Sequence, residues 1–153
     1  MAFTQVRPEA PTTAPPVPPA RPTAHDPRTE TREWLNERIP GAVAAAVAVT
    51  WFVLVQIAFA LEPATNRSVP VIGVMLEVAM YLLLAVMITG LVMQRRWGLA
   101  ASLAGAVLAT AASIACPVTG HHPFGTWWFG QMACMLGLVA VSVVTLRRQY
   151  ADV

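Results

Sequence analysis

The residue types best suited to metal chemistry lie in one short segment, Cys-Pro-Val-Thr-Gly-His-His-Pro. Thiolate and imidazole groups are ligands that zinc and copper accept, and a nearby methionine favours Cu(I). The candidate metal ligands are therefore Cys116, His121 and His122. Met132 or Glu62 could add a further donor. The spacing matches no zinc motif, so the alternative is a polar interfacial loop shaped by its prolines and glycine.

A carboxyl group at Glu77 stands about two turns inside an otherwise apolar stretch, and Tyr81 follows one turn later on the same helical face. A charged carboxylate is costly in hydrocarbon, so we expect Glu77 to face the bundle interior, where it pairs or stays protonated. Two roles remain open: a proton or ligand site, and a neutral group that holds helices together by hydrogen bonds.

Other polar and sulfur-bearing side chains are expected at a similar depth, whereas the opposite halves of the apolar stretches look nearly featureless. This pattern predicts a polar cluster under one face of the membrane. Possible additional partners for its carboxyl group are Arg67 and the loop histidines. The cluster comprises Gln56, Glu77, Tyr81, Gln131 and Cys134.

The two cysteines, Cys116 and Cys134, allow at most one disulfide. A disulfide needs their Cα atoms within about 7 Å, which would require the outer loop to dip inward, so two separate thiols are expected. The sequence lacks Cys-x-x-Cys, Ser-His-Asp, phosphate-loop and dinucleotide patterns and thus favours a non-enzymatic protein. Haem is not expected, because neither histidine of the pair projects from an apolar stretch.

The elements that position these side chains follow from composition. The chain has 153 residues, of which 56% are hydrophobic and 12% are charged. Soluble domains carry about 25% charged residues, so a soluble globular protein is excluded. A spanning helix needs about 20 apolar residues, and short loops force neighbouring helices to run antiparallel. We predict an all-α integral membrane four-helix bundle, up-down-up-down, with spans at 41–61, 71–93, 98–115 and 126–146.

Arginines divide unequally between the two sides of this bundle. One side holds only Arg67, so the positive-inside rule places both termini in the cytoplasm and makes the chain a multi-pass protein of the plasma membrane. The absence of lysine and the richness in Ala, Val and Arg indicate a bacterial source. No basic patch is dense enough for nucleic acid. The cytoplasmic arginines are Arg28, Arg32, Arg38, Arg95, Arg96, Arg147 and Arg148.

Two segments precede the four-helix domain of residues 41–153. Residues 1–27 are rich in proline and predict a disordered or polyproline II tail. Residues 28–40 predict a short interfacial amphipathic helix, with Trp34, Leu35 and Ile39 on one face.

Small residues recur at helical spacing in the third and fourth spans, which predicts close packing between these spans. The same faces could join other membrane subunits or a second copy of the chain. The stripes are Ala101, Gly105, Ala109 and Ser113 in one span, and Gly130, Ala133, Gly137 and Ala140 in the other.

Three functional hypotheses follow. The leading one is a non-enzymatic small subunit or accessory protein of a membrane assembly, in contact with the lipid bilayer and other subunits. The second is a copper, zinc or redox site at the outer face, built on Cys116, His121 and His122. The third is proton-coupled transport centred on Glu77, which the absence of an inverted repeat disfavours.

Overall fold

The computed structural model describes residues 27–64, 71–120 and 122–151. These residues are all-helical apart from short connections and a single isolated bridge. Of the predicted tail, residues 1–27, all but Pro27 lie outside them. Four of the helices are long and apolar enough to cross a membrane, which fits a multi-pass membrane protein. The helices are α1 (Pro27–Asn36), α2 (Gly41–Leu61), α3 (Val71–Val92), α4 (Arg96–Val118) and α5 (Thr126–Ala151).

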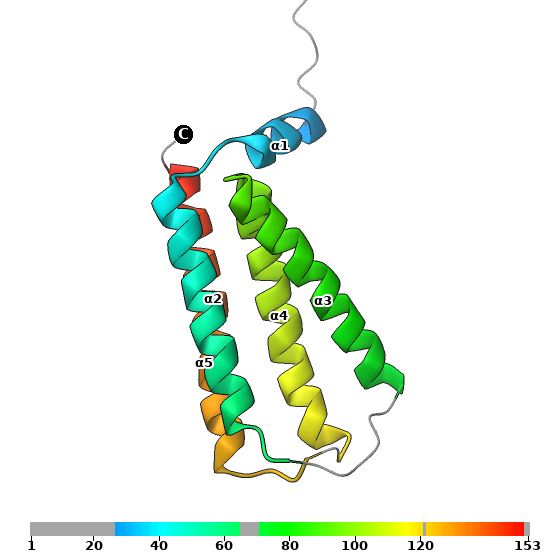
Figure 1. Cartoon of the computed structure of the whole chain (residues 1–153). Coiled ribbons are helices and arrows are strands. Elements are labelled where there is room, and N and C mark those ends of the chain that lie inside the picture. The colour runs from blue at the N-terminus through cyan, green and yellow to red at the C-terminus, as the bar shows by residue number, and fades with distance from the viewer. Residues whose placement is uncertain (1–26, 65–70, 121, 152–153) are drawn as a thin grey trace, which may run out of the picture.

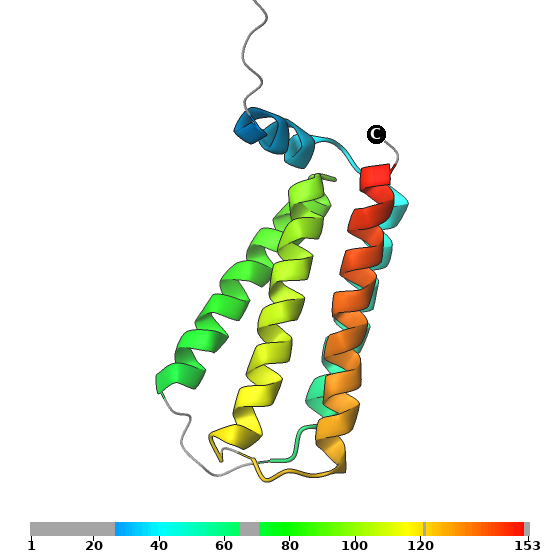
Figure 2. The ribbon, with the colours of Figure 1, turned by 180° about the vertical axis from the view of Figure 1, so that it is seen from behind.

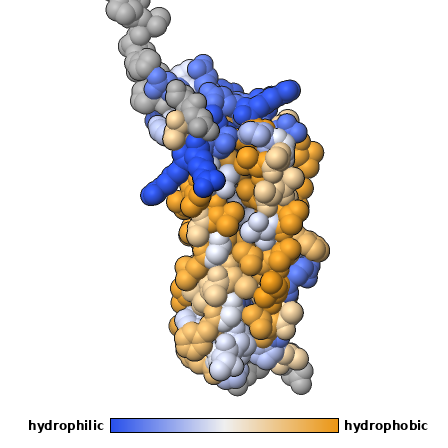
Figure 3. Space-filling model, turned by 90° about the vertical axis from the view of Figure 1, so that its left-hand side faces the viewer, coloured by the Kyte–Doolittle hydropathy of each residue, from blue (hydrophilic) through white to orange (hydrophobic). Residues whose placement is uncertain are grey.

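The four long helices alternate in direction, as predicted, and lie in the spatial order α3, α4, α5, α2 (Figures 1 and 2). Helix α1 and the C-terminal end of α5 lie at the same end, which we call the inner end. The α4–α5 connection lies at the opposite, outer end. Between the two ends the surface is mainly hydrophobic, and the strongest hydrophilic colour gathers around α1 (Figure 3).

Helix α4 is longer than predicted at both ends, and it includes Cys116 and Pro117, which we expected in a loop. Proline lacks an N–H, so Pro117 cannot donate to the carbonyl four residues earlier. That carbonyl belongs to Ser113, and it accepts instead from Trp128 Nε1 at 2.9 Å. The α5 indole thus compensates for the proline and lets α4 continue.

The small-residue stripe of α4 is buried, but the α5 stripe does not face it. A Cβ added to Gly130 or Gly137 would meet leucine side chains of α2 rather than any atom of α4. Ala133 and Ala140 are exposed. The prediction that both stripes meet each other is therefore wrong for α5, because its glycines admit the bulky leucines of α2. The buried stripe residues of α4 are Ala101, Gly105, Ala109 and Ser113.

Helices α3 and α4 touch through their backbones near the inner end. A Cβ on Gly90 would lie 2.4 Å from the Cα of Gly98, so only glycine permits this crossing. Helix α3 ends here with Gln94 in the left-handed region (φ 53°), and Arg95 N donates to Gly90 O at 2.9 Å. From this crossing, α3 diverges from α2 towards the outer end (Figures 1 and 2).

A buried hydrogen-bond network joins three helices in the middle of the bundle. Trp51 Nε1 of α2 donates to Ser102 Oγ of α4 at 2.7 Å, and Ser102 lies 2.7 Å from Ser142 Oγ of α5. Both serines are at most 1% exposed. The expectation that the inner halves of the spans are featureless is therefore wrong, since small hydroxyls that look bland in sequence are paired by the fold.

Helix α1 lies across the inner end and is attached to the bundle by side chains and backbone. Arg96 forms an ion pair with Glu37 at 2.5 Å and stacks over the Trp34 ring at 5.2 Å. Trp34 also contacts the Tyr150 ring, with centroids 5.5 Å apart. The predicted interfacial helix thus has its tryptophan against the protein.

The predicted interfacial helix, residues 28–40, extends four residues too far at its C-terminal end, because α1 ends at Asn36. The residue before a proline disfavours helical geometry, and Pro40 follows Ile39. Ile39 is instead buried, and its N–H donates to Gln94 O at 2.8 Å. The side chain of Arg95 adds a hydrogen bond to the Asn36 carbonyl.

Candidate functional site

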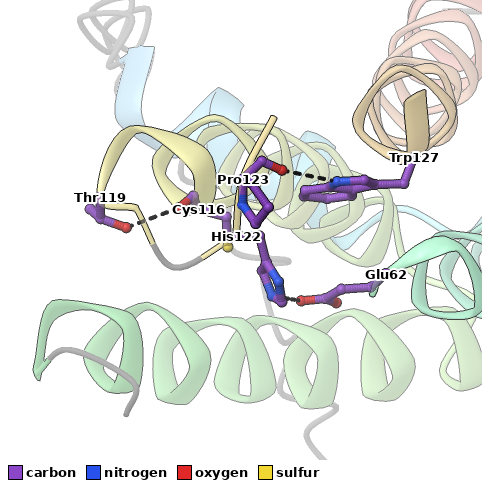
Figure 4. Close-up of polar contacts among 6 residues, drawn as sticks. All are labelled: Glu62, Cys116, Thr119, His122, Pro123 and Trp127. Carbon is purple, nitrogen blue, oxygen red and sulfur yellow. Dashed lines mark hydrogen bonds and ion pairs between the residues drawn. The ribbon is translucent and has the colours of Figure 1, made fainter. Parts of the chain in front are cut away.

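The outer end brings together an acidic side chain and an imidazole from opposite parts of the chain. Glu62 caps the C-terminus of α2, and its Oε1 lies 2.9 Å from His122 Nε2 (Figure 4). The His122 side chain is only 2% exposed, against 29% for Glu62. Because a carboxylate only accepts, the imidazole donates this hydrogen bond whether it is neutral or protonated.

The end of α4 explains how His122 reaches Glu62. Thr119 Oγ1 donates to Ala115 O at 2.9 Å and to Cys116 O at 3.2 Å, so the last turn is closed by a side chain. Gly120 then adopts φ 71°, a left-handed conformation that suits glycine and turns the chain back.

Trp127 of α5 completes this cluster. Its ring packs edge-on against His122 with centroids 5.5 Å apart, and its Nε1 donates to Pro123 O at 3.1 Å (Figure 4). The indole therefore braces the loop and covers the imidazole. We call Glu62, His122 and Trp127 the outer cluster.

Cys116 lies beside the outer cluster on the last turns of α4 (Figure 4). Its thiol is partly exposed and lies within electrostatic range of the Glu62 carboxylate. His121 is outside the described residues. Among the residues that the structure describes, no three His, Cys, Asp or Glu side chains are grouped closely enough to hold a metal ion.

The predicted intramembrane polar cluster is divided between the surface and the interior. Glu77 and Tyr81 are exposed on α3, where Tyr81 Oη donates to Glu77 Oε1 at 3.2 Å. The expectation that Glu77 faces the bundle interior is therefore wrong for the single chain, because the outer half of α3 diverges from α2. Gln56 is also exposed, on α2.

Gln131 and Cys134 of α5 are the interior members of that set, each 9% exposed. Gln131 Oε1 has no hydrogen-bond partner within the described part of the chain. Cys134 and Cys116 are both free thiols. The structure thus brings Glu77 and Tyr81 together, and it places Glu62 with His122, but it does not gather all the predicted polar residues at one point.

Sequence reasoning missed the Trp51–Ser102–Ser142 network and the pairing of Arg96 with Glu37. A signal for the network was present, because a tryptophan in the middle of an apolar span needs an acceptor for its N–H. No comparable signal marks Ser102 or Ser142 as its partners, since serine is common on packed membrane helices.

The described helices therefore form a bundle in which four helices are long and apolar enough to cross a membrane, with an outer cluster of Glu62, His122 and Trp127 and an exposed carboxyl on α3. In comparisons with family models, curated proteins and solved structures, nothing matched this chain.

Proposed function

We propose that this protein is a non-enzymatic small subunit or accessory protein of an assembly in the plasma membrane, with both termini in the cytoplasm. The observation that carries the proposal is how little of α3 is buried within the chain. In its most apolar stretch of 18 residues, only 6% is buried within the chain, against 39% in the corresponding stretch of α4. A spanning helix that packs mainly on one neighbour, α4, and carries an exposed carboxyl is suited to meeting another protein.

The position of Glu77 supports this proposal. An ionisable group that faces lipid is costly, and in membrane proteins such groups nearly always face a protein interior or a water-filled cavity. In the single chain, the Glu77 carboxyl accepts one hydrogen bond from the described residues, that of Tyr81 Oη at 3.2 Å. A partner helix over this face would remove the carboxyl from lipid and supply further donors.

The test is purification of the tagged full-length protein from its native membrane in polymer nanodiscs, followed by native mass spectrometry. We expect a complex of fixed stoichiometry. Val78→Trp, on the exposed face of α3, should dissociate it, whereas the matched Phe52→Trp on the exposed face of α2 should not. A monomer in every sample would contradict the proposal.

A second candidate, a copper- or zinc-handling or redox site at the outer face, is favoured by the outer cluster. The His122 imidazole and the Glu62 carboxylate already lie 2.9 Å apart, and Cys116 is beside them. Nitrogen, oxygen and thiolate ligands together suit zinc, and the thiol also suits copper. The further ligand of this candidate would be His121.

Metal analysis of protein purified without chelators tests this candidate. The site predicts about one equivalent of zinc or copper, lost in Cys116→Ser and His122→Ala and kept in Glu77→Gln, which lies outside the outer cluster. Metal far below one equivalent in the unmodified protein would exclude the candidate. Proton-coupled transport centred on Glu77 has less support, because an exposed carboxyl on α3 lines no interior path in the described bundle.

A further inference from the structure

The outward face of α3 carries a regular stripe of exposed residues. Its members recur at alternating intervals of four and three residues, the spacing by which parallel helices pack with a left-handed crossing. Near the middle of the stripe is a small residue, Ala85, which lets two helix backbones approach closely. The stripe comprises Val74, Val78, Tyr81, Ala85, Ile88 and Val92, all of them exposed.

Glu77 borders this stripe, next to Val78 and one turn from Tyr81. The pair carries both halves of a hydrogen-bonding unit, since Tyr81 donates to Glu77 at 3.2 Å and the second carboxyl oxygen of Glu77 remains to be matched. A surface with both a donor and an acceptor at one depth is complementary to itself. Such a surface suits an isologous contact, in which the same patch is used by both copies.

We propose that two copies of this chain associate through α3, with Val78, Tyr81 and Ala85 at the centre of the contact, the two Tyr81 side chains facing each other, and each Glu77 at the edge beside its own Tyr81. This inference rests on the proposed function and names its partner. Both copies insert in the same orientation, so the two-fold axis runs along the membrane normal and the two α3 helices lie parallel. Each Glu77 then lies at the same depth as its counterpart.

The contact gives hydrogen-bond partners to a carboxyl that lies on a largely apolar face. In its protonated form, Glu77 can donate one hydrogen bond and accept others, so two Glu77–Tyr81 pairs can close a four-membered ring of hydrogen bonds. The same ring leaves no carboxyl facing lipid. The small-residue stripe of α4 does not compete as the interface, because Ala101, Gly105 and Ala109 are buried within the chain.

The experiment uses purified full-length protein in vesicles of phosphatidylethanolamine and phosphatidylglycerol. A photoreactive benzoylphenylalanine replaces Val78 in the stripe or, as the control, Met75, which lies about 100° around the helix from the midline of the stripe. Both positions are exposed and lie at similar depth. We expect a covalent dimer from position 78 and little from position 75.

Energy transfer between labelled copies, followed as lipid dilutes the protein, gives the dissociation constant of the dimer. Glu77→Leu and Tyr81→Phe should each weaken the dimer by about threefold to tenfold. The double variant should be no weaker than the worse single variant, because the two groups act as one unit. Tyr81→Phe removes a single hydroxyl and should leave the fold intact. A weaker dimer in this variant therefore shows that the weakening in Glu77→Leu is not caused by misfolding.

Equal crosslinking at positions 75 and 78, or a dissociation constant unchanged by both variants, would overturn the inference. A third result separates it from the proposed function: crosslinking from position 78 to a different protein in native membranes, with no dimer in vesicles. The chain would then be a subunit whose α3 meets another protein, and the self-association proposed here would be wrong.

Discussion

The inner and outer ends of the bundle differ in how many helices meet. At the inner end, α3 and α4 touch at Gly90 and Gly98, and the α3–α4 loop is hydrogen-bonded to the end of α1 and to the residues that follow it. At the outer end, α3 has moved away from α2, and Glu77 is left on the surface. The outer end is closed by loops and side chains, as in the contact of Glu62 with His122.

This difference indicates a division of roles. The closely packed inner end holds the helices in one arrangement through contacts within the chain. The divergent outer half of α3 adds little to that arrangement and remains available to a partner. Substitutions at the inner end should therefore change folding stability, whereas those on outer α3 should change association.

The largest expected effect comes from a substitution that disrupts the crossing of α3 and α4 at the inner end. Gly90→Ala places a Cβ 2.4 Å from Gly98 Cα, and backbone cannot move aside as a flexible side chain can. We expect a loss of about 3 kcal/mol or more in unfolding free energy, measured by titration of dodecylsulfate into mixed micelles. Gly41→Ala is the control, since its Cβ would meet only the Gln94 side chain, at 3.2 Å. Similar stabilities for the two variants would refute the backbone contact.

Two leucines of α3, one buried and one exposed, allow the inner part of this helix to be compared with the part further out. Leu91 is 4% exposed near the inner end, whereas Leu82 is 64% exposed. Leu91→Ala should lose about 2–4 kcal/mol of unfolding free energy, because it leaves a cavity. Leu82→Ala should lose less than about 0.5 kcal/mol at protein dilutions where the chain is monomeric. Equal losses in the same micelle titration would contradict the division of roles.

The mid-bundle network predicts a smaller effect. Ser102→Ala removes the acceptor of the Trp51 N–H and the partner of Ser142, leaving both buried groups unpaired. We expect a loss of about 1–2 kcal/mol, together with a shift in tryptophan fluorescence. Thr110→Ala is the control, because that hydroxyl donates to Ala106 O of its own helix. A Ser102→Ala variant as stable as Thr110→Ala would show that the network contributes nothing.

The smallest expected effect concerns the outer end of α4. Trp128→Phe removes the donor to Ser113 O and should lose about 1 kcal/mol. In a Pro117→Ala background, a backbone N–H becomes available to that carbonyl, so the same substitution should lose less. The double-mutant cycle reports the coupling directly. Equal losses in both backgrounds would mean that the indole does not compensate for the proline.

The span positions were predictable because they depend on local composition. The four apolar stretches became α2 to α5, and errors were confined to their ends. At the outer end of α4 the error has a specific cause: whether a helix can pass Pro117 depends on a donor from Trp128, eleven residues later and on another helix.

The candidate site was predicted less well, for a similar reason. Glu77, Gln56 and Gln131 were assigned to one cluster by depth alone, but depth does not say which way a side chain points. Rotation and divergence of α3 place Glu77 outside, while Gln131 is buried. His122 was named as a candidate, yet its contact with Glu62 depends on the turn at Gly120.

The sequence by itself determined that this chain has four helices long and apolar enough to span a membrane, joined by short connections, because burial of apolar surface and helix length are properties of contiguous residues. The tertiary structure alone decided which faces meet: Gly90 against Gly98, Trp51 with Ser102 and Ser142, and α3 left open at the outer end. Those outcomes depend on close packing and hydrogen bonding between residues far apart in the chain. Such contacts form only where the backbones approach closely enough for small groups to touch.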